Sequence, residues 1–276
     1  MAPAPAAAAA PASPAVAGLD IRAAYGLAGN GVRDDAAGLQ RALREQRGPL
    51  VLPGGTYLIG TPVSVPSNTT LQLAPDAVLR SAPGPWRYEG VLDVSQVSNV
   101  SISGGGFEGG PGGAIYGINV LDSTAVRIRD VRAVNFQPQA FGGGDGIYVG
   151  GVQQPSRQVV IENCRLADNV RQGISVTHAD GVVIRGCHIS GTRSKMPGAG
   201  IDLEPNGGQS VRNVEVIDNT LTGNHIGLLV LGEQGGNYLG DVRTIRISGN
   251  HLEGNRFLPM VVTRAFNVLS LGNTGL

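Results

Sequence analysis

A pair of acidic side chains two positions apart is the first feature of this sequence that suggests chemistry. The pair is Asp202 and Glu204, in the segment GAGIDLEPNGG, where the acids alternate with apolar residues. Side chains at positions i and i+2 of a β-strand lie on the same face, with their Cα atoms about 6.5–7 Å apart. The paired carboxyl groups of glycoside hydrolases stand about 5–9.5 Å apart, and repulsion between such groups raises one pKa. The pair therefore predicts acid–base cleavage of a glycosidic bond, with plain solvated surface as the alternative.

Other polar residues fall near this pair once the chain is divided into repeats that begin at a glycine. Arg171 lies between the repeats of Asp145 and Asp202, where a guanidinium is suited to hold a carboxylate or sulfate of a sugar. Tyr148 offers an aromatic face for stacking or a hydroxyl proton. For Asp145 and for His178, a role in a turn is the alternative interpretation.

These considerations give two groups of candidate residues on one expected face. The candidate catalytic residues are Asp202, Glu204, Asp145 and His178. The candidate substrate-binding residues are Tyr148, Arg171, Ser175, Thr177, Lys195 and Tyr238. Loops carried on a rigid scaffold commonly wall a groove, and the variable segments expected to do so here are residues 136–145, 151–157, 192–199 and 232–241.

The elements that must position these residues repeat along the chain at a nearly constant period. Each copy reads Gly-apolar-x-apolar, followed by a variable turn and two further short apolar strands. The first apolar residues are spaced 29, 27, 27 and 27 positions apart, at Ile118, Ile147, Ile174, Ile201 and Leu228. A fixed period of this length with three short strands per repeat indicates a solenoid of stacked coils. The predicted fold class is all-β, a parallel β-helix.

One turn position of the repeat supports the same alignment of the coils. Cys164, Cys187, Asn219 and Asn250 occupy it, and stacking would place successive members about 4.8 Å apart in one column. Successive asparagines in such a column form a ladder of side-chain amides. The two cysteines are interpreted as a stacked pair of buried thiols, with a disulfide bond as the alternative.

The N-terminal part of the chain differs from the repeats. Residues 1–18 are rich in alanine and proline and are predicted to be a disordered leader, such as a remnant left after removal of a signal peptide. Residues 19–276 are predicted to form a single domain, of which residues 19–60 are its N-terminal cap region. This region is expected to run strand, glycine-rich loop, helix and strand, with the helix at about residues 35–46.

The expected helix is suited to cover the open end of the solenoid, which begins near Pro49. Either Asp34 or Asp35 is expected to cap its N-terminus. Its apolar stripe, which would face the first coil, consists of Leu39, Ala42 and Leu43. A solenoid needs such a cap because its end exposes apolar surface.

The composition of the chain limits the classes of partner that it is expected to bind. The chain has 21 basic and 21 acidic residues, with no basic stripe and no apolar run of about 18 residues, so neither nucleic acid nor a membrane is a predicted partner. Two cysteines do not make a disulfide framework, no zinc motif is present, and no metal ligand is assigned. A monomer and a homo-oligomer are both compatible with the sequence.

Three segments carry a resemblance to a known family. GNGVRDDAAGLQRAL, LVLPGGTYLIG and VPSNTTLQLAPDAVL resemble the N-terminal region of the pectate-lyase superfamily, and the resemblance extends from about residue 19 to the end. It implies a right-handed parallel β-helix that acts on polysaccharides. Because the superfamily includes hydrolases, lyases, C5-epimerases, phage tailspikes and non-catalytic members, the resemblance does not by itself select a reaction.

The motifs of individual families within this superfamily are matched only in part. GGDGI supplies Asp145 for the first acid of polygalacturonases, but VRQGI has Arg171 and Gln172 where those enzymes have two acids. YGINVL keeps the Tyr-Gly of alginate epimerases but has Asn119 in place of the acid. Pectate lyases bind calcium through acids on this sheet, and the residue types are present here without the motif. Calcium is therefore expected only if the chain is a lyase.

The predicted function is that of a secreted or periplasmic enzyme that cleaves a polysaccharide or oligosaccharide in a groove along the first sheet. Acid–base hydrolysis by the paired carboxyl groups is the favoured reaction, and it requires no cofactor. One alternative is elimination or C5-epimerisation of a uronate polymer. The other is a non-catalytic glycan-binding or tailspike-type module.

Overall fold

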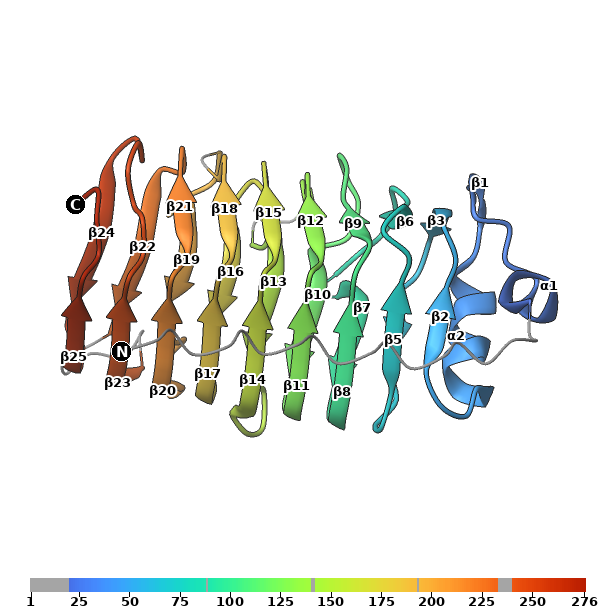
Figure 1. Cartoon of the computed structure of the whole chain (residues 1–276), viewed down its shortest axis with the longest axis horizontal. Coiled ribbons are helices and arrows are strands. Elements are labelled where there is room, and N and C mark those ends of the chain that lie inside the picture. Colours follow the sequence, from blue (N-terminus) through green and yellow to red (C-terminus); the bar gives the residue numbers. More distant parts are fainter. Residues whose placement is uncertain (1–19, 88, 140–141, 193, 233–239) are drawn as a thin grey trace, which may run out of the picture.

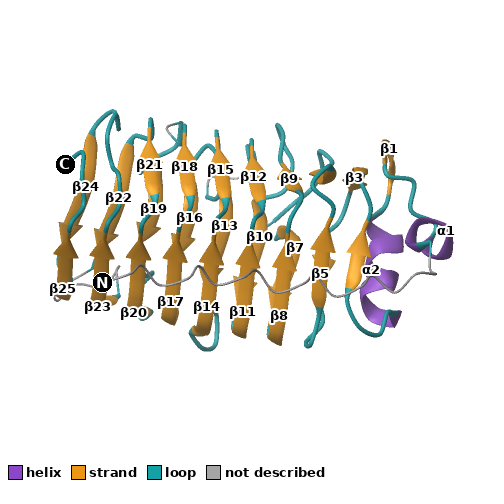
Figure 2. Cartoon of the chain, in the orientation of Figure 1, coloured by secondary structure: helices purple, strands orange, loops and turns teal. Residues whose placement is uncertain are grey.

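The computed structural model describes residues 20–87, 89–139, 142–192, 194–232 and 240–276, which form a solenoid of parallel strands (Figure 1). The coils stack along the long axis, and the strands fall into three sheets in which each strand pairs with the equivalent strand of the next coil. Helices occur only at the N-terminal end of the stack within the described residues (Figure 2). The all-β, parallel β-helix class predicted from the repeat is confirmed.

Within each coil the chain visits the first, second and third sheet in turn. The first sheet contains β4 (Val63–Ser64), β7 (Gly90–Ser95), β10 (Tyr116–Leu121), β13 (Asp145–Gly150), β16 (Gln172–Val176), β19 (Ala199–Leu203), β22 (Ile226–Leu231) and β24 (Leu258–Thr263). The second sheet contains β2 (Leu50–Leu52), β5 (Thr70–Leu73), β8 (Ser98–Ser103), β11 (Thr124–Arg129), β14 (Ser156–Glu162), β17 (Ala179–Arg185), β20 (Ser210–Ile217), β23 (Asp241–Ser248) and β25 (Phe266–Leu271). The third sheet contains β1 (Asn30–Asp34), β3 (Gly55–Ile59), β6 (Ala77–Ser81), β9 (Gly106–Glu108), β12 (Arg132–Val134), β15 (Arg165–Ala167), β18 (His188–Ser190) and β21 (Thr220–Thr222).

The N-terminal cap consists of two helices, α1 (Ile21–Tyr25) and α2 (Ala36–Glu45). Helix α2 confirms the predicted cap, and its buried face is the predicted apolar stripe together with Ala36. Asp35 occupies the N-cap position, but its carboxylate accepts from the N–H groups of Ala28 and Gly29, while Asp34 accepts from Ala36 N–H. The predicted leader, residues 1–18, lies outside the described residues.

Helix α1 corrects the expectation of a strand at the start of the cap. Its first turn is capped by Asp20, whose side chain accepts from the N–H groups of Arg22 and Ala23. Gly26 ends the helix in the left-handed conformation that favours glycine. These two local signals outweigh the extended pattern expected for LDIRAAY.

The interior is filled by apolar side chains that stack coil upon coil. Ile118 pairs in register with Ile147, which continues through Ile174 and Ile201 to Leu228. All five side chains are inaccessible to solvent. Fully burying one such side chain contributes about 1.5–3 kcal/mol, so a residue repeated at this position stabilises every coil in the same way.

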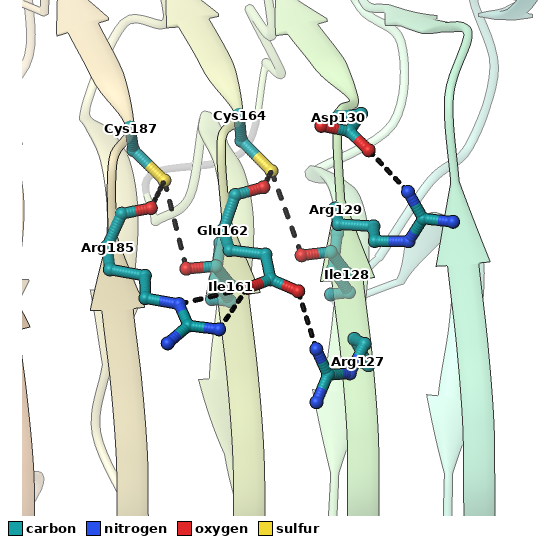
Figure 3. A network of polar contacts seen from close by, with 9 residues as sticks. All are labelled: Arg127, Ile128, Arg129, Asp130, Ile161, Glu162, Cys164, Arg185 and Cys187. Atoms are coloured by element: carbon teal, nitrogen blue, oxygen red, sulfur yellow. Dashed lines mark hydrogen bonds and ion pairs between the residues drawn. The ribbon is translucent and has the colours of Figure 1, made fainter. Parts of the chain in front are cut away.

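The predicted turn column is also confirmed. His188 N–H donates to Cys164 O, Thr220 N–H to Cys187 O and His251 N–H to Asn219 O, which places the coils in successive contact. Asn219 Nδ2 donates to Asn250 Oδ1 at 2.9 Å, and this is the expected amide ladder. Cys164 and Cys187 are free, buried thiols side by side on neighbouring coils (Figure 3).

Charged residues on the outer face of the second sheet pair across coils. Glu162 accepts from Arg127 at 2.6 Å and from Arg185 at 2.5 Å, one on each side (Figure 3). The hydrogen bond from Arg185, with that from Arg127, lowers the pKa of the Glu162 carboxyl. Glu162 therefore remains ionised although it is nearly buried.

A column of glycines interrupts the alternation of inward and outward residues in the first sheet. At Gly146 a Cβ atom would lie 2.5 Å from Leu166 Cδ2, and at Gly173 it would lie 2.2 Å from Ile189 Cγ2. Both glycines therefore face the interior, as do the isoleucines that follow them. Because the glycine and the following isoleucine both point inward, the residue before the glycine lies on the outer face. Asp145, which precedes Gly146, therefore lies on the outer face, where it contacts Ser175.

We predict that Gly173→Ala destabilises the protein by about 1–3 kcal/mol, the usual cost of inserting a methyl group into a packed core. The new Cβ would also lie 2.6 Å from the carbonyl oxygen of Gly200, which is backbone and cannot rotate away. Gly110→Ala is the matched control, because no atom lies within 4 Å of its Cβ position. Urea unfolding measures both, and equal stabilities of the two variants would contradict this account of the glycine column.

Candidate functional site

The outer face of the first sheet is buried, unlike that of the second sheet. Along β11 buried and exposed residues alternate, as expected for a sheet with one face in water. Every residue of β16 and of β19 is buried. The loops at the ends of the first-sheet strands therefore cover its outer face.

A groove of about 940 Å³ lies on this face. Its floor comes from β10, β13, β16 and β19. The walls include four pairs of described loop residues: Gln139 and Gly143, Gly151 and Val152, Lys195 and Met196, and Asn206 and Gln209. The first three pairs lie in segments predicted to wall a groove, whereas most of the predicted segment 232–241 lies outside the described residues. Seven of the candidate residues line the groove: Tyr148, Arg171, Ser175, Thr177, Lys195, Asp202 and Glu204.

Asp202 lies at the groove floor but is only 2% exposed, so it is not the open surface acid that its outward position suggested. Its Oδ2 atom accepts a hydrogen bond of 2.7 Å from Gln172 Nε2, and its Oδ1 atom is buried without a partner among the described residues. Burial raises the pKa of Asp202 well above its ordinary value, and the negative charge of Glu204 raises it further. Asp202 therefore favours the protonated form.

Glu204 lies two residues further along the same segment and also lines the groove. It is half-buried, and its backbone N–H donates to Val176 O at 3.1 Å. Its negative charge raises the pKa of Asp202. The predicted acid pair is therefore brought together in one groove, with one member buried and the other partly open to solvent.

Asp145 is fully buried and is not among the described residues that line the groove. Its Oδ2 atom accepts from Ser175 Oγ at 3.0 Å, whereas Oδ1 has no partner in the described structure. Burial raises the pKa of Asp145 to about 6, although the charges of Arg171 and Lys195 oppose the shift. Asp145 thus lies beside the floor, held by a residue that is part of it.

Arg171 extends over the outer face as expected, but it reaches the acids indirectly. Its Nη1 atom donates to Gln172 Oε1 at 3.0 Å, and Gln172 in turn donates to Asp202. Its positive charge lowers the pKa of both Asp145 and Asp202. Arg171 therefore acts on both acids by its charge and contacts Asp202 through the amide of Gln172.

Two tyrosines form an aromatic surface at the other side of the floor. The rings of Tyr116 and Tyr148 stack with centroids 4.6 Å apart and planes inclined by 22°. The Tyr148 hydroxyl shares a hydrogen bond of 2.8 Å with Thr177 Oγ1. Burial raises the pKa of Tyr148, which keeps its hydroxyl proton in place.

Lys195 connects two of the wall loops. Its Nζ atom donates to Pro138 O at 3.3 Å, and its backbone N–H donates to Val170 O. Burial lowers the pKa of Lys195, while the nearby charge of Asp145 opposes that shift. The ammonium group therefore belongs to the wall of the groove and acts on the acid beside its floor.

His178, a candidate catalytic residue, is not among the described residues that line the groove, in keeping with the alternative of a role in a turn. Its Nδ1 atom accepts from Ser210 N–H at 3.1 Å in the next coil, so the ring closes a turn. Tyr238 lies outside the described residues.

Several polar groups of the site are not among the residues predicted from the sequence. Gln172 was noted only as a departure from a motif, yet it contacts both Arg171 and Asp202. Gln209 Nε2 donates to Gly151 O, and Asn206 donates to Gln209, so these wall residues hold each other. The signal for Gln172 was its place before a column glycine, the same place that Asp145 occupies.

The described residues include no group of three His, Cys, Asp or Glu side chains arranged to hold a metal ion. Asp145, Asp202 and Glu204 do not form such a group. Of the helices in the described part of the chain, none has the length and apolar character needed to cross a membrane.

Known proteins similar to this chain include phage appendage proteins and carrageenases. The pre-neck appendage protein of Bacillus phage phi29 is 28% identical over 188 residues, which cover 59% of this chain and 22% of the phage protein. The chain thus spans about a fifth of the length of the curated phage relatives that it matches.

Solved structures agree with this fold. The pre-mature bacteriophage phi29 gene product 12 superimposes with a TM-score of 0.67 at 22% identity, covering 90% of this chain and 34% of that one. An iota-carrageenase complexed to iota-carrageenan fragments gives a TM-score of 0.64 at 17% identity, covering 84% of this chain and 54% of that one. At such identities the likeness establishes the fold alone.

The part of the chain that forms the coils matches a family model. Residues 91–274 match the family model described as the right handed beta helix region. This match and the solved structures agree with the resemblance to the pectate-lyase superfamily. The chain belongs to the right-handed β-helix family.

Proposed function

We propose that this chain is a polysaccharide-active enzyme that hydrolyses a glycosidic bond in the groove on the first sheet. The observation that carries the proposal is the pair formed by Asp202 and Glu204, two carboxyl groups of one segment that line one groove in different environments. Environments that push the pKa values of two carboxyl groups apart assign one as acid and the other as base. A secreted or periplasmic location is part of the proposal, because polysaccharide substrates are found there.

Asp202 is the general acid in this proposal. Burial and the charge of Glu204 raise the pKa of its carboxyl group, which suits it to donate a proton to the oxygen of the departing sugar. Glu204, which is partly open to solvent, acts as the carboxylate that activates water or attacks the sugar. The charge of Asp145 raises the pKa of Asp202, and its carboxyl group accepts the hydrogen bond that holds Ser175 in place.

The charge of the groove supports an anionic polysaccharide as the substrate. Two cationic side chains, Arg171 and Lys195, line the groove beside its floor. A carboxylate or sulfate of a sugar is suited to that place. The stacked rings of Tyr116 and Tyr148 offer apolar area against which a sugar ring packs.

Elimination and C5-epimerisation are less favoured reactions at this site. A calcium-dependent lyase needs oxygen ligands that converge on one ion, and the acids of the described residues do not form such a group. Both reactions also need a base at the α-proton of a uronate. His178, the candidate histidine for that role, is bonded to the backbone of Ser210 instead.

A non-catalytic appendage module is the second candidate function. It is favoured by the sequence similarity to the pre-neck appendage proteins of Bacillus phages PZA and phi29. In that case the groove binds a glycan without cleaving it. The buried, partly unsatisfied carboxyl groups argue against this alternative, because a binding surface gains nothing from their cost.

Product analysis separates the three possibilities. The full chain is incubated with a panel of neutral, uronate and sulfated polysaccharides, and new ends are measured. Hydrolysis gives reducing ends alone, elimination gives unsaturated ends that absorb ultraviolet light, and a binding module gives neither. Retention of a polysaccharide on the protein without any new ends would contradict the enzymatic proposal.

We predict that Asp202→Asn and Glu204→Gln each lower turnover by about 10²–10⁴-fold, the range typical of a general acid or base. Both variants should remain folded, because the asparagine oxygen still accepts the hydrogen bond from Gln172 and the glutamine is isosteric. Glu215→Gln on the second sheet is the control and should retain full activity. Full activity of both groove variants, measured with thermal melting alongside, would remove these acids from the mechanism.

We also predict that stability falls as the pH rises from about 4 to 6. Asp145 shifts from an ordinary pKa of 3.8 to about 6 on folding, so in this interval the folded protein keeps a proton that the unfolded chain releases. A shift of this size corresponds to about 3 kcal/mol of folding stability. This contribution is lost progressively as the pH rises from about 4 to 6, and Asp145 causes no further loss above that interval. Urea unfolding at successive pH values measures the slope, which Asp145→Asn should reduce.

Asp180→Asn is the control for this pH dependence. The hydrogen bond from Asn213 lowers the pKa of Asp180, so its stabilising effect is present at higher pH and is lost as the pH falls through its lowered pKa. Its removal should leave the decline between about pH 4 and 6 in place. An unchanged slope in Asp145→Asn would show that the carboxyl group does not titrate as described.

A further inference from the structure

Gln172 connects a cation to an acid from a fully buried position on β16. Its Oε1 atom accepts from Arg171 Nη1 at 3.0 Å, and its Nε2 atom donates to Asp202 Oδ2 at 2.7 Å. The proposed hydrolysis gives this residue no role. A buried amide with both ends engaged is nevertheless held in one orientation.

The chemistry of the two neighbours fixes that orientation. A guanidinium has only donors, so the atom of Gln172 that faces Arg171 is the carbonyl oxygen. The amide nitrogen then faces Asp202, and the Oδ2 atom in contact with it acts as an acceptor. Exchanging the two ends of the amide would place donor against donor at Arg171.

This orientation leaves one place for the proton of a neutral Asp202. Because Oδ2 accepts from Gln172, the proton resides on Oδ1. Oδ1 is shielded from solvent and lacks a partner among the described residues. Asp202 lines the groove, so a bound sugar that displaces the side chains shielding Oδ1 brings an oxygen able to accept that proton.

We propose that Gln172 is a positioning residue that holds the acidic proton of Asp202 on Oδ1, where the substrate can take it up. Arg171 keeps the amide in place, so the three side chains act as one unit. The catalytic consequence rests on the proposed hydrolytic function, but the effect of Gln172 on the titration of Asp202 is measurable without any substrate.

Several charged groups act on the same carboxyl group. Glu204, on the same segment, and Asp145, from β13, favour its protonated form, whereas Arg171 opposes it. Lys195, from the wall loop, acts on Asp145. Gln172 is uncharged, and its N–H favours the ionised form of Asp202 through a hydrogen bond. Loss of Gln172 and loss of Glu204 therefore shift the titration of Asp202 in opposite directions.

The test compares Gln172→Met and Gln172→Glu with a control, Gln72→Met, at an exposed glutamine of β5. The protein is labelled with carboxyl-¹³C aspartate, and the Asp202 signal is identified as the one missing from Asp202→Asn. Each variant is titrated by NMR across about pH 3–9. Turnover and KM are measured on any polysaccharide that the unmodified protein cleaves.

The expected results differ among the variants. Methionine removes the donor, so the pKa of Asp202 rises and kcat falls by about 10- to 100-fold with KM nearly unchanged. Glutamate keeps the contact with Arg171 but presents an acceptor to Asp202, which draws the proton to Oδ2, so the pKa rises and kcat falls further. Gln72→Met changes neither quantity.

Unchanged titration of Asp202 in both Gln172 variants would overturn the proposal, as would full activity of Gln172→Glu. Thermal melting shows whether Gln172→Met folds, and Gln172→Glu decides the matter if it does not, because it retains the size of the side chain and the contact with Arg171. If the unmodified protein cleaves nothing, the hydrolytic function fails. The NMR titration still decides whether Gln172 controls the protonation of Asp202.

Discussion

Parallel stacking in fixed register is the constraint on which the rest of this structure depends. Backbone hydrogen bonds place Ile147 opposite Ile174, and Ile174 opposite Ile201, one coil apart. A slip of one residue would turn every side chain of a strand to the opposite face. The register therefore decides at once which apolar residues fill the interior and which polar residues share the outer face. Tyr148, Ser175 and Asp202 are neighbours for the same reason that the isoleucines are.

Burial is what distinguishes this outer face from ordinary surface. On an open sheet, acids and amides exchange hydrogen bonds with water at little cost, but beneath loops each polar group needs a partner in the protein. Asp145 and Asp202 have a partner for one oxygen only. A buried polar group without a partner costs folding free energy, and proteins generally keep such a group where it has a function. The covered face, more than the presence of acids, is the reason to regard the groove as a site.

The coil pattern could be predicted from the sequence because period and register follow from local spacing. Cys164, Cys187, Asn219 and Asn250 stack as predicted, and the cap helix covers the expected end. The depth of Asp202 could not be predicted, because it depends on loops that meet only in the folded chain.

Gln172 and His178 show the limits of pattern in other ways. Simple alternation would place Gln172 on the same side as Ile174, but Gly173 also faces the interior, which leaves Gln172 on the outer face. His178 has the chemistry of a base, but its Nδ1 atom accepts a hydrogen bond from the backbone of Ser210. Residue type thus predicted most of the side chains that line the groove, whereas the hydrogen bonds that determine which of them can act on a ligand became visible only in the structure.

The loops that wall the groove leave the stack at the ends of first-sheet strands and return to it without altering the register. The coil that begins at Ile118 is two residues longer than the coil that begins at Ile147, yet Ile118 and Ile147 still pair directly. Changes in loop length are therefore absorbed outside the sheets, where they cost little free energy. Such a scaffold can acquire new walls over an unchanged floor, so ligand preference can diverge among descendants faster than the coils that support it.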